Sequence, residues 1–171
     1  MNTDQIEVIE RKISQIYTSC NNEDLQKNEL PRQAVIMVGY SEQYLAAAKV
    51  IEANLHLILP RLQMTGQAIE LILKACIAGC NQTPPHDHDL IKLCKRCVNY
   101  DYCLSEADVA WIFHLNHHFY KDVVTKTKYK SRYPTGSIEP VGGVCPEVDK
   151  FQDILDKLKK QIINNIGVEY F

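Results

Sequence analysis

Three histidines near the middle of the chain are the side chains best suited to proton transfer or metal binding. His114 lies three residues before His117 and four before His118, so they share one face if the segment is helical. Two histidines at this spacing can ligate a metal ion. No third ligand follows nearby, and no Glu stands between them as in a metalloprotease motif. The pattern therefore favours a polar, solvated helix face.

A Cys-x-x-Cys segment raises the separate question of zinc. Cys94 and Cys97 have a spacing that zinc sites use, and His86, His88 and Cys103 are close in sequence. The two cysteines also fall on an apolar helical stripe with two leucines, where cysteine behaves as a small apolar residue. The second ligand pair of a closed four-coordinate site has no recognisable spacing. We predict no metal and no cofactor, although the sequence leaves zinc binding by Cys94, Cys97, His86 and His88 open.

The clearest charge feature is a basic segment, residues 121–133, in which tyrosines alternate with cations and one Asp is the only acid. Lysines can neutralise phosphates, and tyrosines can stack on unpaired bases. The alternative is the solvated end of a helix, where cations complement the helix dipole. The candidate nucleotide- or RNA-binding residues here are Lys126, Lys128, Lys130, Arg132 and Tyr133.

Apolar residues recur at helical spacing along nearly the whole chain, and no window alternates as a strand does. The candidate residues must therefore be positioned by helices. We predict helices over about residues 6–20, 32–58, 60–79, 87–99, 105–130 and 146–166.

The spacing also predicts which face of each helix is buried. The second helix should bury Tyr44, Ala47, Ala48, Ile51, Leu55 and Ile58. The fifth should bury Val109, Ile112, Phe113, Tyr120 and Val123, with Asn116 on the same face. Ser105 and Asp108 form a capping-box-like start to this helix, in which Asp replaces the usual Glu.

Length and composition indicate one ordinary globular domain. The 171 residues carry a net charge of −2, so the overall charge does not indicate a nucleic acid or a membrane partner. The polar start has no apolar signal core, and no run approaches the roughly 18 apolar residues of a membrane span. The seven cysteines lack framework spacing. We therefore expect reduced thiols, a cytoplasmic location and no membrane association.

Three sequence motifs, in this order, resemble those of HEPN domains. They are the Gln67-Ala68-x-Glu70-x-x-x-Lys74-Ala75 segment, His88-x-Leu90, and Arg132-Tyr133-Pro134. HEPN domains are small all-helical modules tied to nucleotide and RNA chemistry. The resemblance implies an all-α fold, an antiparallel four-helix bundle with an additional helix at each terminus. The expected layout is a helix and loop at 1–31, a HEPN-like core at 32–134, a loop at 135–145 and a C-terminal helix at 146–171.

His88 also has an interpretation that does not depend on the resemblance. It is predicted at the start of a helix, where free backbone N–H groups and the helix dipole disfavour an imidazolium. A neutral imidazole there could hydrogen-bond to the neighbouring helix. A structural role and a binding role are both open.

The resemblance also defines what a catalytic member needs. Ribonuclease members place an Arg about four to six residues ahead of a His, which suits RNA cleavage because the His transfers protons and the Arg stabilises developing charge. None of the five arginines, Arg11, Arg32, Arg61, Arg96 and Arg132, has a His at that spacing. We therefore assign no catalytic residue.

Three functions follow as hypotheses. The first is a non-catalytic binding module for a nucleotide, single-stranded RNA or a partner such as a nucleotidyltransferase, with His88 and Asn116 added to the basic segment. The second is a divergent metal-independent ribonuclease of toxin–antitoxin type. The third is a homodimeric helical adaptor without a nucleic-acid role. A homodimer is expected in any case, because symmetric dimers are common among such domains.

Overall fold

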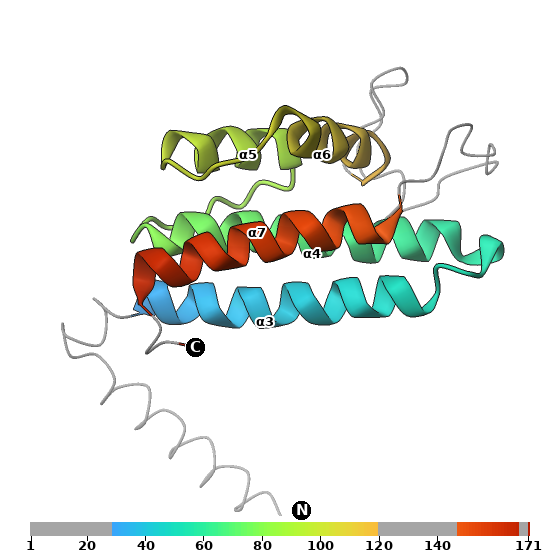
Figure 1. The fold of residues 1–171 in the computed structure, drawn as a ribbon, viewed down its shortest axis with the longest axis horizontal. Helices are drawn as coiled ribbons and strands as arrows, with labels where there is room; N and C mark the ends of the chain where they lie inside the picture. The colour runs from blue at the N-terminus through green and yellow to red at the C-terminus, as the bar shows by residue number, and fades with distance from the viewer. Residues whose placement is uncertain (1–28, 120–146, 168–170) are drawn as a thin grey trace, which may run out of the picture.

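The computed structural model describes residues 29–119, 147–167 and 171, and this part of the chain contains helices and no strand (Figure 1). In chain order the elements are α3 (Glu29–Val50), the 3₁₀ turn η1 (Leu55–Leu57), α4 (Ile58–Gly79), α5 (Leu90–Asn99), α6 (Glu106–Phe119) and α7 (Val148–Ile166). The predicted all-α class is confirmed. The helix predicted over 6–20 and the basic segment lie outside the described residues.

The helix α4 is the centre of the bundle and contacts α3, α5, α6 and α7. Helices α3, α4 and α7 lie side by side along the long axis, while α5 and α6 cover another side of α4 (Figure 1). Because only a short turn joins α3 to α4, these two helices run antiparallel. The fold therefore places α5 and α6 together against one central helix.

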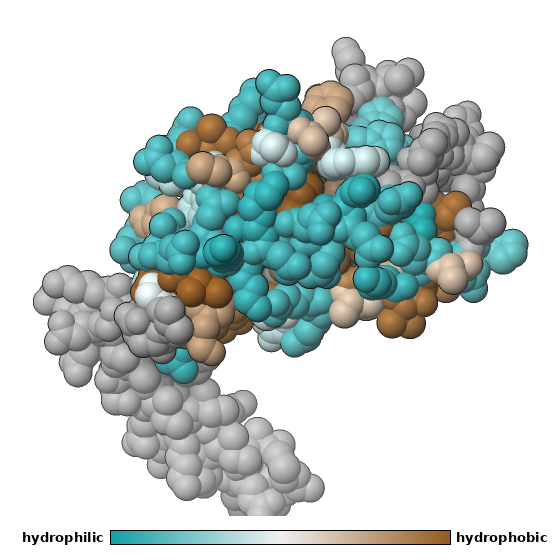
Figure 2. Space-filling model, in the orientation of Figure 1, coloured by the Kyte–Doolittle hydropathy of each residue, from teal (hydrophilic) through white to brown (hydrophobic). Residues whose placement is uncertain are grey.

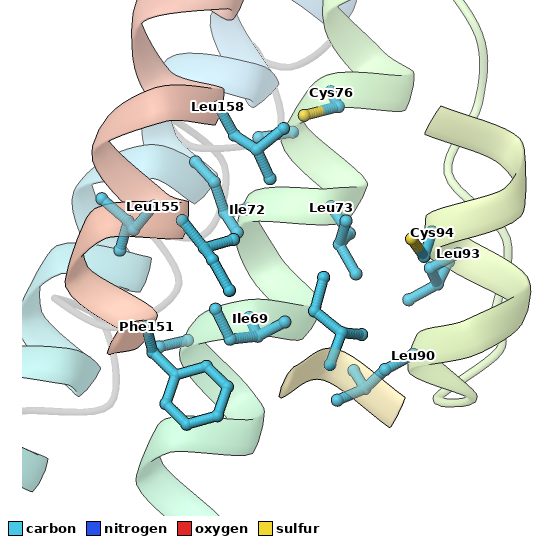
Figure 3. Packing of buried hydrophobic residues seen from close by; sticks show 14 of the residues in the cluster. Ile69, Ile72, Leu73, Cys76, Leu90, Leu93, Cys94, Phe151, Leu155 and Leu158 are labelled. Atoms are coloured by element: carbon cyan, nitrogen blue, oxygen red, sulfur yellow. The ribbon is translucent and has the colours of Figure 1, made fainter. Parts of the chain in front are cut away.

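The sequence of α4 explains its position, because most of its residues after the first turn are apolar or small, and its polar side chains Gln63, Gln67, Glu70 and Lys74 share one stripe. A helix with so wide an apolar surface is stable in water only when neighbours cover that surface. Figure 3 shows Ile69, Ile72 and Leu73 of α4 between apolar side chains of α7 and of α5. The predicted third helix is confirmed. It begins at Ile58 rather than Pro60, which lies in the first turn, where a missing N–H is tolerated.

The amphipathic helix α7 lies against both α3 and α4. Its buried residues are Val148, Phe151, Ile154, Leu155, Leu158 and Ile162, and its outward surface is mainly hydrophilic (Figure 2). The helix ends before Gly167, whose φ of 97° lies in a region that glycine adopts without strain. The predicted C-terminal helix is present and begins at Val148 instead of residue 146.

The start of α7 is held by the connection between α3 and α4. The backbone N–H of Val148 donates to Glu52 Oε1 over 2.9 Å, which satisfies one of the free N–H groups of the helix start. Arg61 lies 3.8 Å from the same carboxylate, and Lys49 pairs with Asp149 at 2.6 Å. Residues far apart in sequence thus fix where α7 begins.

The structure corrects the predicted second helix. It ends at Val50 instead of continuing to Ile58, and the Asn54 side chain accepts the His56 N–H at the start of η1. The buried face consists of Pro31, Ala34, Val38, Ser41, Leu45 and Ala48. Of the predicted face Ala48 is buried, whereas Ala47, Ile51 and Ile58 are half-buried and Tyr44 is 41% exposed. The three consecutive alanines 46–48 made the register ambiguous by one position.

The register of α6 is corrected in the same way. Ile112 is buried as predicted, but Val109 and Phe113 are 36% and 57% exposed. The buried face is Asp108, Ile112, Leu115 and Phe119, about 100° away around the helix. Tyr120 and Val123 lie outside the described residues.

The predicted capping box at the start of α6 is confirmed. The Ser105 N–H donates to Asp108 Oδ2 over 2.8 Å, and the Asp108 N–H donates to Ser105 Oγ over 3.2 Å. Burial alone would raise the pKa of Asp108, but hydrogen bonds from Lys157 and Ser105 outweigh it and hold this pKa below its usual value. Lys157 belongs to α7, so the same carboxylate joins α6 to α7.

The end of α6 packs closely on α4 at a glycine. A Cβ added to Gly66 would overlap the ring of Phe119, which is fully buried. The absence of a side chain at residue 66 therefore lets the last residue of α6 sit against the central helix. The basic segment at 121–133 begins two residues later in the chain.

Candidate functional site

The candidate site begins with a carboxylate inside the bundle. Glu70 of α4 is 2% exposed, and its Oε1 receives the Lys74 ammonium at 2.8 Å. The Nδ1 of His88 lies 2.8 Å from the same oxygen. Removing a carboxylate from water is costly unless it is paired and hydrogen-bonded. Two partners at hydrogen-bond distance account for Glu70 at this position.

The loop before α5 brings His88 to that carboxylate. Asp87 Oδ1 accepts the backbone N–H groups of His88 and Asp89 over 2.9 and 3.0 Å, which closes a local turn. Lys92 pairs with Asp87 at 3.0 Å. Burial would raise the pKa of Asp87, but these hydrogen bonds and Lys92 lower it overall. The predicted hydrogen bond from His88 to a neighbouring helix is thus present.

The start of α5 is capped by residues from two elements. Asp89 accepts the N–H groups of Ile91 and Lys92 over 3.0 and 3.4 Å. Asn116 of α6 accepts the Leu90 N–H over 2.8 Å and donates to Asp89 over 3.3 Å. The first N–H groups of α5 are therefore occupied, so this helix start is not an anion site. The predicted start at residue 87 is corrected to Leu90, because Asp89 is the cap.

The structure brings together two of the predicted binding residues, His88 and Asn116, at the start of α5. Both link elements of the bundle, since His88 joins α5 to α4 and Asn116 joins α6 to α5. The other predicted binding residues, Lys126, Lys128, Lys130, Arg132 and Tyr133, lie outside the described residues. Among the described helices, α7 contacts α3, α4 and α6 but not α5.

Comparison with known proteins gives one match. A family model described as the HEPN domain matches residues 39–163, from within α3 to within α7. The chain belongs to the HEPN domain family. HEPN domains are in general associated with nucleotides and RNA. No curated protein and no solved structure matches significantly.

The histidines of α6 form a small aromatic group in this HEPN bundle. The rings of His114 and His118 have centroids 5.1 Å apart, and so do those of His117 and His118. All three side chains are half-buried, and Trp111 lies against His114 with a centroid distance of 6.5 Å. They share one side of the helix, as their spacing predicts, and the polar, solvated face that the sequence favours is half-buried in the structure.

The Cys-x-x-Cys segment faces the interior. Cys94 and Cys97 are buried as the stripe predicts, and the Cys97 thiol donates to the Leu73 carbonyl over 3.3 Å. Burial raises the pKa of Cys94 to about 11, which favours the neutral thiol over the thiolate that metals bind. Among the residues that the structure describes, no group of three or more His, Cys, Asp or Glu side chains could hold a metal ion. In the same part of the chain no helix is long and apolar enough to cross a membrane.

Three residues of the site were not identified as site residues from the sequence. Glu70 and Lys74 served only as signs of the HEPN resemblance, although a Glu four residues before a Lys predicts a pair on a helix. Their position within an apolar helix was the available sign that the pair is buried. Asp89 directly precedes an apolar helical stripe, which is the usual position of an N-cap.

Proposed function

We propose that this HEPN domain binds a nucleotide or single-stranded RNA without cleaving it. Family membership supports the class of ligand. The observation that carries the non-catalytic part is the sequence itself, because none of the five arginines has a His four to six residues later, as ribonuclease members do.

The ligand contacts are proposed to come mainly from the basic segment. Residues 121–133 supply lysines and an arginine for phosphates and tyrosines for base stacking. The segment follows directly on α6, whose last residue is anchored on Gly66.

The test is to incubate purified protein with mixed single-stranded RNA in EDTA, and to measure a band shift and cleavage in the same samples. We expect a salt-sensitive shift without cleavage, and loss of the shift in a Lys128→Ala, Lys130→Ala, Arg132→Ala triple variant. The matched control is Lys49→Ala, Lys150→Ala, Lys160→Ala, which removes three exposed lysines elsewhere. Equal binding by both variants would contradict a role for the basic segment.

The pair of Glu70 and His88 favours a second candidate, a metal-independent ribonuclease. A carboxylate at hydrogen-bond distance from Nδ1 can orient a histidine as a general base. RNA cleavage that resists EDTA and disappears in His88→Ala would establish this candidate instead. If the protein neither binds nor cleaves RNA, a protein partner such as a nucleotidyltransferase becomes the next hypothesis.

A further inference from the structure

The helix α5 carries an exposed cationic face, which we define as Lys92, Lys95 and Arg96. These residues are spaced by three and four, so they share one side of the helix. The opposite side buries Leu90, Leu93, Cys94 and Cys97 against the bundle. Because the buried side of α5 packs on the bundle, the cationic side chains of the opposite side face solvent.

The charge of this face is not balanced within its own helix. No acidic residue occurs between Leu90 and Asn99. Lys92 is paired with Asp87, but Lys95 and Arg96 have no ion pair within the described residues. Elsewhere, lysines of α7 are paired across the bundle, Lys157 with Asp108 and Lys159 with Glu42. The α5 face therefore presents two exposed cations without an ion pair, Lys95 and Arg96, on a helix that Asp89 and Asp101 flank.

Both ends of α5 are fixed, so these cations stand on a rigid support. Asp89 and Asn116 cap its start. At its end the Tyr100 N–H donates to the Arg96 and Cys97 carbonyls over 3.2 and 3.0 Å. A preorganised helix loses little entropy when a ligand binds along it.

We propose that the α5 face binds the sugar-phosphate backbone of single-stranded RNA, in an inference that rests on the proposed function. Charge complementarity selects this ligand, because Lys and Arg side chains neutralise phosphates and release their counterions. Lys95 and Arg96 carry this contact, because Lys92 is already paired with Asp87. The α5 face contacts the RNA strand, and the basic segment that follows α6 contacts the same strand.

The experiment compares a Lys95→Ala, Arg96→Ala variant with a Lys150→Ala, Lys160→Ala control. Each removes two exposed cations, from α5 and from α7 respectively. Affinity for a single-stranded RNA of mixed sequence is measured by fluorescence anisotropy across salt concentrations. In the α5 variant the steepness of the plot of log K against log salt concentration should fall by about 1.4. Over the tenfold range from 1 M to 0.1 M salt, this fall corresponds to a loss of about 25-fold in affinity relative to the unaltered protein. The control should retain the slope of the unaltered protein.

The outcomes separate this inference from the proposed function. RNA binding with an unchanged slope in the α5 variant overturns the α5 site alone, whereas no RNA binding by the unaltered protein overturns both. Equal losses in the two variants would mean a general charge effect, which also overturns the site. Tighter binding of poly-glutamate than of RNA at the same face would assign it to an acidic protein instead. Thermal unfolding of each variant confirms that the changes act on binding and not on folding.

Discussion

At the scale of single residues, the buried carboxylate of Glu70 makes the strongest electrostatic interactions of the site. Its carboxylate is nearly inaccessible, whereas the side chains of Lys74 and His88 are 14% and 34% exposed. Breaking a buried pair leaves a charge without its partner, which costs more than the pair itself contributes. Glu70 therefore positions both His88 and Lys74 through hydrogen-bond contacts inside the bundle.

We predict that Glu70→Gln lowers the free energy of unfolding by about 2 kcal/mol, less than for a fully buried pair because both partners reach solvent. Urea denaturation measures this. The matched control is Glu42→Gln, which breaks the more exposed pair with Lys159 and should cost less than about 1 kcal/mol. If both changes have the same small effect, Glu70 is not an electrostatic anchor.

At the scale of elements, the contact of α6 with α4 depends on one missing side chain. Alanine normally stabilises a helix relative to glycine by roughly 0.5–1 kcal/mol. At Gly66 this gain is opposed by overlap with the buried ring of Phe119. Helices α4 and α6 are thus joined at the residue where α4 has no side chain.

Gly66→Ala is predicted to destabilise the protein by about 1–3 kcal/mol, because Phe119 must move out of a packed position. Gly39→Ala in α3 is the control, since nothing lies within 4 Å of its added Cβ, and it should be neutral or stabilising. Thermal and urea unfolding of both variants give the comparison. A stabilising Gly66→Ala would show that α6 adjusts freely.

Helices and caps were predictable from the sequence where several signals agreed. The buried stripe of α5 and the capping box at Ser105 were both confirmed. The buried faces of α3 and α6 were predicted one position off, because apolar residues adjoin the true stripe and only tertiary contacts select between them. The network from Glu70 to Asn116 joins three helices, and spacing along one helix cannot show which neighbour a polar side chain meets.

At the scale of the whole molecule, one apolar stripe is exposed along α3. Ile36, Tyr40 and Tyr44 recur every four residues and are 51%, 53% and 41% exposed. The other side of α3 packs on α4 and α7. Contiguous apolar surface of this kind is typical of interaction sites, and a second copy of the chain is the proposed occupant.

We expect the protein to be dimeric at micromolar concentration and an Ile36→Glu, Tyr40→Glu variant to be monomeric. Light scattering coupled to size exclusion measures the mass directly. Val50→Glu introduces the same charge at a residue that is 83% exposed at the end of α3, and it should leave the dimer intact. A monomeric unaltered protein would remove the dimer from consideration.

The position of α7 has a consequence for how the chain reaches its native state. Its partners lie about a hundred residues earlier, as the pairs of Lys49 with Asp149 and of Lys159 with Glu42 show. Contacts this distant in sequence form slowly, because a long loop must close first. During synthesis α3 and α4 therefore emerge with an uncovered apolar groove that is filled only when residues 148–166 leave the ribosome. Until then the nascent chain is a natural substrate for chaperones that hold exposed apolar surface.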